Sequence, residues 1–218
     1  MELEKNEKKI CLPRVYFITH RNERFTYLDS AKVALDSGIR LIQLRMKDAN
    51  KEEIKSTAEE LRTICRNYDA ILVLDDHVEI VRELNLDGVH LGLKDMPIKE
   101  AKCILNPRQI TGATANEYCH IASAFEQGAD YIGLGPFRFT RTKSNLSPVL
   151  GLDSSKKILS QCKANKINLP IYAIGGIEIR DIESLVNAGF YGIAVSSLIL
   201  DSEHPADTAR HLIEIFNE

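Results

Sequence analysis

The chain lacks the features that would place it in a membrane, an oxidising compartment or a nucleic-acid complex. No apolar run in its 218 residues approaches the ~18 needed to cross a bilayer, and MELEKNEKKI at the start lacks the apolar core of a signal peptide. Its five cysteines form no C-x-x-C pair, which favours reduced thiols in a cytoplasmic protein. The formal net charge of -3 disfavours a general nucleic-acid binder. We therefore expect a cytoplasmic protein without membrane or nucleic-acid partners.

Two common enzyme signatures are also missing. No G-x-G-x-x-G turn follows the first predicted strand, as it would in a dinucleotide-binding doubly wound sheet. No Ser-His-Asp or Cys-His arrangement is evident, and no histidine pair has the spacing of metal ligands on one helix. His90 is expected to pack in or beside the sheet instead.

Short apolar runs of strand length alternate with helical patterns along the whole chain. About eight such units recur at a mean spacing of roughly 25 residues. The predicted strands cover 15–19, 39–47, 71–74, 87–91, 109–113, 130–134, 170–174 and 192–195. We predict an α/β fold, a single (β/α)8 TIM barrel over residues 1–218 with 1–12 as a flexible tail. An open doubly wound sheet is the alternative.

The predicted helices are marked by apolar stripes and by terminating glycines. They cover 28–35, 51–67, 78–84, 98–105, 118–127, 154–163, a segment ending at Gly189 and a last helix from Pro205. In the helix before Gly189, the apolar stripe is formed by Ile179, Ile182, Leu185 and Val186.

The second predicted strand alternates between apolar and polar residues. One side of it carries Ile42, Leu44 and Met46, and the other carries Gln43, Arg45 and Lys47. Strands of a parallel sheet are normally apolar on both faces. The polar side therefore indicates a functional site inside the sheet.

The remaining unusual polar residues and glycines also follow predicted strands. They are Asp75, Asp76, Asp95, Thr114, Thr140, Thr142, Lys143, Gly175, Gly176, Ser196 and Ser197. In a barrel, the carboxyl ends of all strands lie on one face, which is the catalytic face. We therefore expect these residues to surround one site.

The residue types at this face suit two anionic substrates, one of them bound with a metal. Carboxylates on neighbouring strands favour Mg²⁺, which often shares its ligand sphere with substrate phosphates. Arg45, Lys47 and Lys143 would neutralise a polyanion such as diphosphate. The backbone amides and hydroxyls of Gly175, Gly176, Ser196 and Ser197 would cradle a phosphomonoester.

Each of these residues also has a simpler structural interpretation. Asp95 could begin a helix, and Asp75-Asp76 could cap the helix that starts near Val78. Lys143 could be a solvated charge, and Gly175-Gly176 a plain turn.

Several stretches together resemble the thiamine-phosphate synthase family over nearly the full length. They are IQLRMKD at 42–48, LDD at 74–76, DGVHLGLKDMP at 87–97, GADYIGLGPFRFTRTK at 128–143, SPVLGL at 147–152, IYAIGGI at 171–177 and GIAVSSLI at 192–199. The resemblance implies that the chain joins 4-amino-2-methyl-5-hydroxymethylpyrimidine diphosphate to 4-methyl-5-(2-phosphoethyl)thiazole. It also implies release of diphosphate, a requirement for Mg²⁺ and a dissociative mechanism.

The resemblance implies a role for each matching residue. Asp76 and Asp95 match the Mg²⁺ ligands. Around the pyrimidine diphosphate it places Gln43, Arg45, Lys47, Thr114 and Lys143, of which Arg45, Lys47 and Lys143 act on the leaving group. Around the thiazole phosphate it places Thr140, Thr142, Gly176 and Ser197. Asp75 stands where the family usually has Asn, and we expect it to share the hydration shell of the metal.

Two other functions fit parts of the pattern. A thiazole tautomerase of the same fold would lack the T-x-T-K segment at 140–143 and carry a histidine shortly after the sixth strand. A phosphate-binding barrel without catalysis would keep Gly175-Gly176 but have no use for Asp76, Asp95 and Lys143. In each case the partners are small molecules, and oligomerisation stays open.

Overall fold

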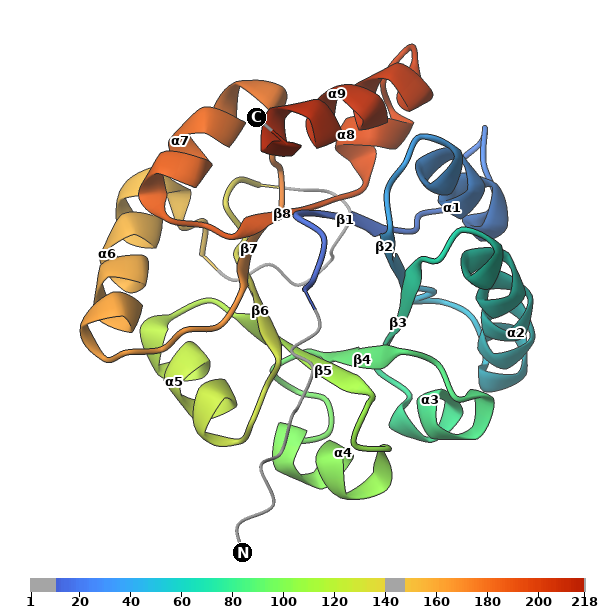
Figure 1. Ribbon diagram of the computed structural model, residues 1–218, viewed down its shortest axis with the longest axis horizontal. Coiled ribbons are helices and arrows are strands. Elements are labelled where there is room, and N and C mark those ends of the chain that lie inside the picture. The colour runs from blue at the N-terminus through green and yellow to red at the C-terminus, as the bar shows by residue number, and fades with distance from the viewer. Residues whose placement is uncertain (1–10, 140–147, 218) are drawn as a thin grey trace, which may run out of the picture.

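A computed structural model describes residues 11–139 and 148–217. Its strands form a closed parallel barrel in which each pairs with the next along the chain and β8 returns to β1 (Figure 1). The strands are β1 (Val15–Ile18), β2 (Leu41–Leu44), β3 (Ile71–Asp75), β4 (Gly88–Leu91), β5 (Ile110–Ala115), β6 (Tyr131–Leu134), β7 (Ile171–Ile174) and β8 (Gly192–Val195). The predicted barrel is confirmed, and the open sheet is excluded.

The helices surround the strands as an outer ring (Figure 1). They are α1 (Tyr27–Asp36), α2 (Lys51–Asn67), α3 (Val78–Leu84), α4 (Ile98–Ile104), α5 (Tyr118–Glu126), α6 (Gly151–Ala164), the 3₁₀ helix η1 (Ile179–Asp181), α7 (Ile182–Ala188), α8 (Ser197–Leu200) and α9 (Pro205–Asn217). In the described residues, none is long and apolar enough to cross a membrane.

Alternation along each strand separates two cores. Ile42 and Leu44 belong to the core between the strands and the helices, as the pattern of the second strand predicts. Tyr16, Tyr131 and Tyr172 belong to a second core inside the barrel. The three rings lie 5.6–5.8 Å apart in edge-to-face contact, so they fill the interior as a packed layer rather than leaving a pore.

The N-terminal end of the barrel is covered by the segment that leads into β1. Leu12 is 4% exposed and packs with the interior core. Its carbonyl accepts from the Tyr191 hydroxyl, and the Pro13 carbonyl accepts from Tyr172 at 2.7 Å. Residues 1–10 of the predicted tail lie outside the described residues; Leu12, at its end, is packed.

Three of the predicted elements differ from those in the structure. β2 ends at Leu44, so Arg45 and Lys47 lie beyond the strand, and the alternation of a strand does not fix the direction of their side chains. β5 continues to Ala115 and places Thr114 inside the strand. The predicted stripe before Gly189 is wrong at Ile179 and Val186, which are 42% and 41% exposed. Ile179 lies in the tighter 3₁₀ turn, whose side chains do not follow the α-helical spacing.

Candidate active site

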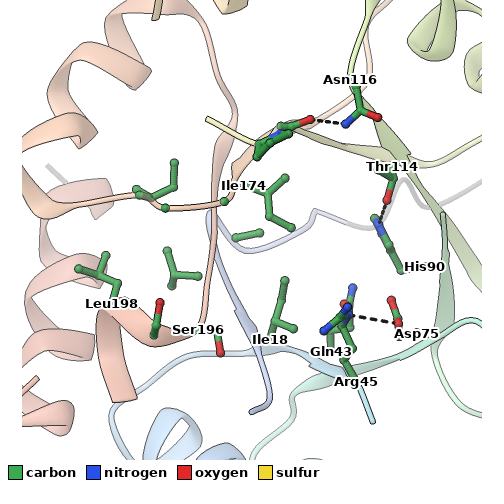
Figure 2. A pocket seen from close by; sticks show the side chains of 18 residues that line it. Ile18, Gln43, Arg45, Asp75, His90, Thr114, Asn116, Ile174, Ser196 and Leu198 are labelled. Atoms are coloured by element: carbon green, nitrogen blue, oxygen red, sulfur yellow. Dashed lines mark hydrogen bonds and ion pairs between the residues drawn. The ribbon is translucent and has the colours of Figure 1, made fainter. Parts of the chain in front are cut away.

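Two adjoining pockets open at the carboxyl ends of the strands. Figure 2 shows the first of them, which we call the cradle pocket. The cradle pocket is lined mainly by the ends of β7 and β8, with Gly175, Gly176, Ser196 and Ser197. The acidic pocket is lined by the ends of β2 to β4, with Lys47, Asp75, Asp76, Lys94 and Asp95. The residues that line both pockets are Arg45, Asp75, Thr114 and Asn116. The two pockets therefore share a wall.

The turn after β7 requires both of its glycines. Gly175 and Gly176 have φ of +91° and +65°, a region that other residues rarely adopt. A Cβ on Gly175 would lie 2.9 Å from the Pro136 Cβ, and one on Gly176 would lie 2.8 Å from the Phe139 carbonyl oxygen. The segment after β6 approaches this closely because the Phe137 amide donates to the Ile174 carbonyl at 2.8 Å. The turn is therefore not a plain surface turn, because both glycines line the cradle pocket.

Ser196 supplies a hydroxyl with no partner in the cradle pocket. Its Oγ is buried and makes no hydrogen bond within the described residues. Buried polar atoms are nearly always hydrogen-bonded, so an unpartnered hydroxyl that lines a pocket marks a position where a ligand could accept or donate a hydrogen bond. A phosphate oxygen would satisfy it.

Arg138 ties the segment after β6 to the segment after β7. Its guanidinium donates to the Gly176 carbonyl at 3.1 Å and, through two nitrogens, to the Asp181 carboxylate, with Nη2 to Oδ1 at 2.7 Å. Asp181 is 8% exposed and also accepts from the Glu178 amide at 2.8 Å. The hydrogen bonds from Arg138 lower the Asp181 pKa. This Arg138–Asp181 clamp fixes the wall of the cradle pocket.

Asp75 and Asp76 occupy different positions in the acidic pocket. The Asp75 Oδ2 lies 3.4 Å from the Arg45 Nε. Asp76 and His77 have consecutive left-handed φ values of +59° and +52°, which is strained for residues other than glycine. Helix α3 has His77 as its N-cap and no side-chain capping bond, so the capping interpretation of Asp75-Asp76 is not supported.

Asp95 closes the turn after β4. Its Oδ2 accepts from the Gly92 amide at 2.6 Å, and a Cβ on Gly92 would lie 2.9 Å from that oxygen. Helix α4 begins at Ile98 after a Pro97 N-cap, so Asp95 does not start a helix. The turn instead holds its carboxylate at the acidic pocket.

Buried side chains inside the barrel support the site from below. Gln43 Nε2 donates to the Tyr16 hydroxyl at 2.7 Å, and Tyr16 and Tyr131 hydroxyls lie 2.9 Å apart. His90 lies between Tyr131 and Thr114, with Nδ1 and Nε2 at 3.2 and 3.0 Å from their hydroxyl oxygens. The prediction that His90 packs in the barrel is confirmed.

The structure brings most of the predicted site residues together. In the cradle pocket lie Gln43, Arg45, Asp75, Thr114, Gly175, Gly176, Ser196 and Ser197; in the acidic pocket lie Arg45, Lys47, Asp75, Asp76, Asp95 and Thr114. Thr140, Thr142 and Lys143 lie outside the described residues.

The analysis of the sequence missed Tyr16 and Tyr131 as supports of the site and gave Asn116 no role in it. The Asn116 side chain donates to the Gly135 carbonyl and joins the wall between the pockets. A usable signal for it was the spacing of two residues from Thr114, because Asn116 lies one residue beyond the end of β5 and continues its alternation on the side of Thr114.

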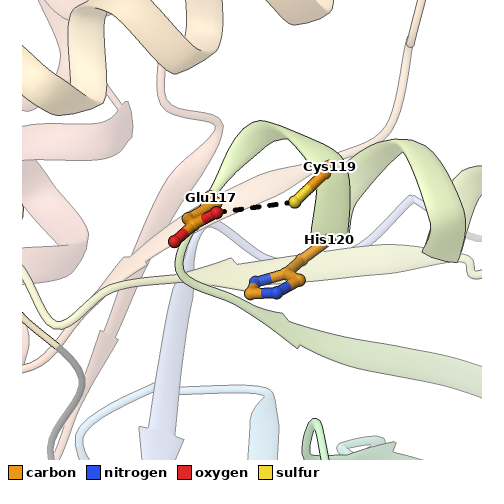
Figure 3. Close-up of side chains that lie close together, drawn as sticks. All are labelled: Glu117, Cys119 and His120. Atoms are coloured by element: carbon orange, nitrogen blue, oxygen red, sulfur yellow. Dashed lines mark hydrogen bonds between the residues drawn. The ribbon is translucent and has the colours of Figure 1, made fainter.

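One further cluster of potential ligand atoms lies at the start of α5. Glu117, Cys119 and His120 form the one trio of such residues, within the described part of the chain, whose ligand atoms approach within 4.8 Å (Figure 3). These atoms have local partners, since Cys119 donates to Glu117 at 3.6 Å and the Asn116 amide donates to His120 Nδ1 at 3.3 Å. The trio lines neither pocket.

Comparison with known proteins finds similar sequences and a similar solved structure over nearly the whole chain. A sequence model of a family described as thiamine monophosphate synthase matches residues 15–199, a range that contains both pockets. The thiamine-phosphate synthase of Bacteroides thetaiotaomicron is 50% identical over 199 residues, covering 91% of this chain and 95% of that protein. Its counterpart in Flavobacterium johnsoniae is 42% identical over 205 residues, covering 94% and 95%. The solved thiamine phosphate pyrophosphorylase from Pyrococcus furiosus is 33% identical, with a TM-score of 0.81 and coverage of 94% and 95%.

Proposed function

Since the chain belongs to the thiamine monophosphate synthase family and is a transferase, we propose that it joins two phosphorylated heterocycles. The substrates are 4-amino-2-methyl-5-hydroxymethylpyrimidine diphosphate and 4-methyl-5-(2-phosphoethyl)thiazole, and the products are thiamine phosphate and diphosphate. The observation that carries this proposal is the pair of pockets with a shared wall. Two substrates bound on either side of one wall can react with each other.

The chemistry of each pocket supports the occupant that we propose for it. The cradle pocket offers close-approach glycines and the orphan Ser196 hydroxyl, which suit the monophosphate of the thiazole. The acidic pocket offers Arg45, Lys47 and Lys94 beside carboxylates, which suits a diphosphate bound with a divalent cation.

Asp76 and Asp95 fit the magnesium ion that the family implies. Both carboxylates line the acidic pocket, and carboxylate oxygens are the ligands Mg²⁺ prefers. Within the described residues, Asp75, Asp76 and Asp95 do not bring three ligand atoms within 4.8 Å of one another. The diphosphate oxygens would therefore complete the ligand set. When bound, the ion would neutralise charge on the leaving diphosphate.

The side chains of the chain act by charge and position. Arg45 and Lys47, with Lys143 from outside the described residues, stabilise the departing diphosphate. Departure leaves a pyrimidine carbocation, and the thiazole nitrogen donates its electron pair to form the new C–N bond. Because this nitrogen carries no proton, no general base is needed. The cradle pocket orients the nucleophile toward the shared wall.

Neither alternative function gains support from a specific observation. A thiazole tautomerase has no use for the acidic pocket, and Gly135-Pro136 follows β6 in place of the expected histidine. A phosphate-binding barrel has no use for carboxylates held beside cations.

The test is a coupling assay with pure protein, both substrates and Mg²⁺. We expect equimolar thiamine phosphate and diphosphate, and neither product when one substrate or the ion is omitted. Isomerisation of a thiazole tautomer without the pyrimidine would indicate the tautomerase. Binding of thiazole phosphate without any turnover would indicate the phosphate-binding barrel.

A further inference from the structure

A continuous chain of hydrogen bonds crosses the floor of the site. It starts at Gln43 and passes through the hydroxyls of Tyr16 and Tyr131 and the ring of His90 to Thr114. The successive distances are 2.7, 2.9, 3.2 and 3.0 Å. Its three middle members are at most 5% exposed, so water does not substitute for these contacts. We call this chain of hydrogen bonds the Gln43–Thr114 relay.

The first bond sets the direction of the others. Gln43 donates through Nε2, so Tyr16 accepts there and must place its own single proton elsewhere. The acceptor at hydrogen-bond distance is the Tyr131 oxygen. Burial raises the pKa of both phenols, and each therefore keeps its proton at neutral pH. Tyr131 then donates to His90 Nδ1, which accepts only when it carries no proton.

We propose that the Gln43–Thr114 relay makes His90 accept at Nδ1 and donate at Nε2, and thereby turns the Thr114 proton toward the substrate. The Nε2–H donates to Thr114 Oγ1, so the hydroxyl proton is left for the pocket. Tyr131 and His90 are positioning residues that act through Thr114. The substrate atom they select is a hydrogen-bond acceptor, and on the pyrimidine diphosphate this is a ring nitrogen. That last identification rests on the proposed function, whereas the tautomer does not.

The reverse direction would have the opposite consequence. If the Gln43 amide were turned so that Tyr16 donated to its Oε1, every bond would reverse, and His90 would carry its proton on Nδ1. Thr114 would then donate to His90 and offer only lone pairs to the pocket. A single proton position on a buried ring thus decides whether the pocket recognises an acceptor or a donor.

The tautomer can be measured in the free protein, without substrates. Nitrogen-15 NMR of imidazole rings distinguishes a protonated from an unprotonated nitrogen, and His90→Gln identifies the His90 signals by their loss. We expect Nε2 protonated and Nδ1 unprotonated near neutral pH. A ring protonated on Nδ1, or on both nitrogens, would overturn the proposal. Because no turnover is involved, this result stands independently of the proposed function.

Kinetics test the action through Thr114, with a control variant from the same core. Tyr131→Phe removes the donor to Nδ1, and we expect kcat/KM for the pyrimidine diphosphate to fall about tenfold, the effect of one misdirected hydrogen bond. KM for the thiazole phosphate should not change. Tyr172→Phe removes a buried hydroxyl that donates to the Pro13 carbonyl, outside the relay. It should leave the kinetics and the His90 signals unchanged.

A double variant separates positioning from damage to the fold. Thr114→Val removes the hydroxyl on which the relay acts, so adding Tyr131→Phe should lower kcat/KM little further. Independent, multiplying losses, or an equal loss in Tyr172→Phe, would show that Tyr131 acts only by supporting the core. If the wild type forms no thiamine phosphate, the proposed function fails, and the NMR result alone decides the relay.

Discussion

Asp75 adds a negative charge beside the expected position of diphosphate, and Arg45 offsets it. The two side chains are 30% and 16% exposed, with Oδ2 and Nε 3.4 Å apart. An unpaired carboxylate there would repel the substrate by several kcal/mol, roughly 4 at 4 Å and an effective dielectric of 20. With Arg45 bound to it, Asp75 is tolerable and need not be a direct ligand.

Replacing Asp75 by the residue usual in the family tests this role. Asp75→Asn should keep most coupling activity, while half-saturation with Mg²⁺ rises about threefold, as expected for losing a weak, partly screened attraction. Titration of Mg²⁺ in coupling assays of both proteins measures the shift. A folded variant that is inactive at every Mg²⁺ concentration would make Asp75 an essential ligand.

Asp95 serves the loop and, by our proposal, the metal, and two variants separate these roles. Asp95→Asn keeps an acceptor for the Gly92 amide, whereas Asp95→Ala removes it. We expect both to lower the coupling rate at least about 100-fold. Only the Ala variant should lose stability, by about 1 kcal/mol in urea unfolding. Wild-type turnover of Asp95→Asn at saturating Mg²⁺ would remove this residue from the metal site.

Polar side chains that face a pocket were easier to predict than buried side chains that hydrogen-bond to each other. Asp76, Asp95 and Ser197 stand at strand ends, where polarity breaks the apolar pattern and is visible in the sequence. Tyr16 and Tyr131 lie within strands, where the sequence pattern does not distinguish them from ordinary core aromatics. Their hydrogen bonds join strands far apart in sequence, and no local pattern encodes that contact.

Among the elements, the turn after β7 depends on glycine for two separable reasons. In Gly176→Ala, the new Cβ would lie 2.7 Å from the Arg138 Cβ at a φ of +65°. We expect KM for the thiazole phosphate to rise about tenfold as the cradle shifts, a cost of roughly 1–2 kcal/mol. KM for the pyrimidine diphosphate should change less than about twofold, within the few tenths of a kcal/mol expected away from a lost contact.

Gly189 provides the matched control for that substitution. It has a φ of +100°, and a Cβ there would meet nothing within 4 Å. Gly189→Ala should therefore cost about 1 kcal/mol of stability and leave both KM values unchanged. Equal weakening of the two substrates in Gly176→Ala would contradict the assignment of the cradle pocket.

The Arg138–Asp181 clamp predicts a pH dependence of stability. The Asp181 pKa is lowered from its ordinary value of 3.8, so the folded state binds this proton less readily than the unfolded state. Its contribution is complete above about pH 5 and is lost as the pH falls below 3.8 toward the folded pKa. Asp181→Asn should be about 1 kcal/mol less stable at pH 6, a small value because Arg138 is partly exposed.

Denaturant unfolding of both proteins from pH 6 to pH 3 measures this effect. The stability difference should shrink at the acid end. Asp207→Asn breaks the exposed pair with Arg210 on α9 and should have little effect throughout. A difference between wild type and Asp181→Asn that stays constant with pH would rule out a charged clamp.

At the scale of the whole molecule, the N-terminal end of the barrel contributes to stability, and the two pockets lie at the opposite end. Leu12 packs at the N-terminal end, on the side of the barrel away from both pockets. Leu12→Ala should lower the free energy of unfolding by about 2 kcal/mol and leave kcat and both KM values as they are. Urea unfolding and steady-state kinetics on one preparation check both halves. A parallel loss of turnover would mean that the ends are coupled.

The architecture was predictable because the same unit recurs along the chain. The apolar runs around Ile42, Leu74 and Ile193 each have the length of a buried strand, and each is followed by a helical pattern. The bounds were less predictable. β2 ends earlier than predicted and β5 continues through Thr114, because the ends of a strand are set by its pairing with the neighbouring strands. Only the closed structure contains that information.

The wall shared by the two pockets has a consequence for the order in which substrates enter. Arg45, Asp75, Thr114 and Asn116 line both pockets, so any rearrangement made for one proposed substrate changes the surface presented to the other. The two binding equilibria are therefore linked, and the linkage is reciprocal. Whatever factor one heterocycle imposes on the affinity of its partner, the partner imposes in return. The free energy of the ternary complex is the same by either route, so a preferred sequence of arrival reflects the affinities of the two binary complexes and the rates of access to each pocket.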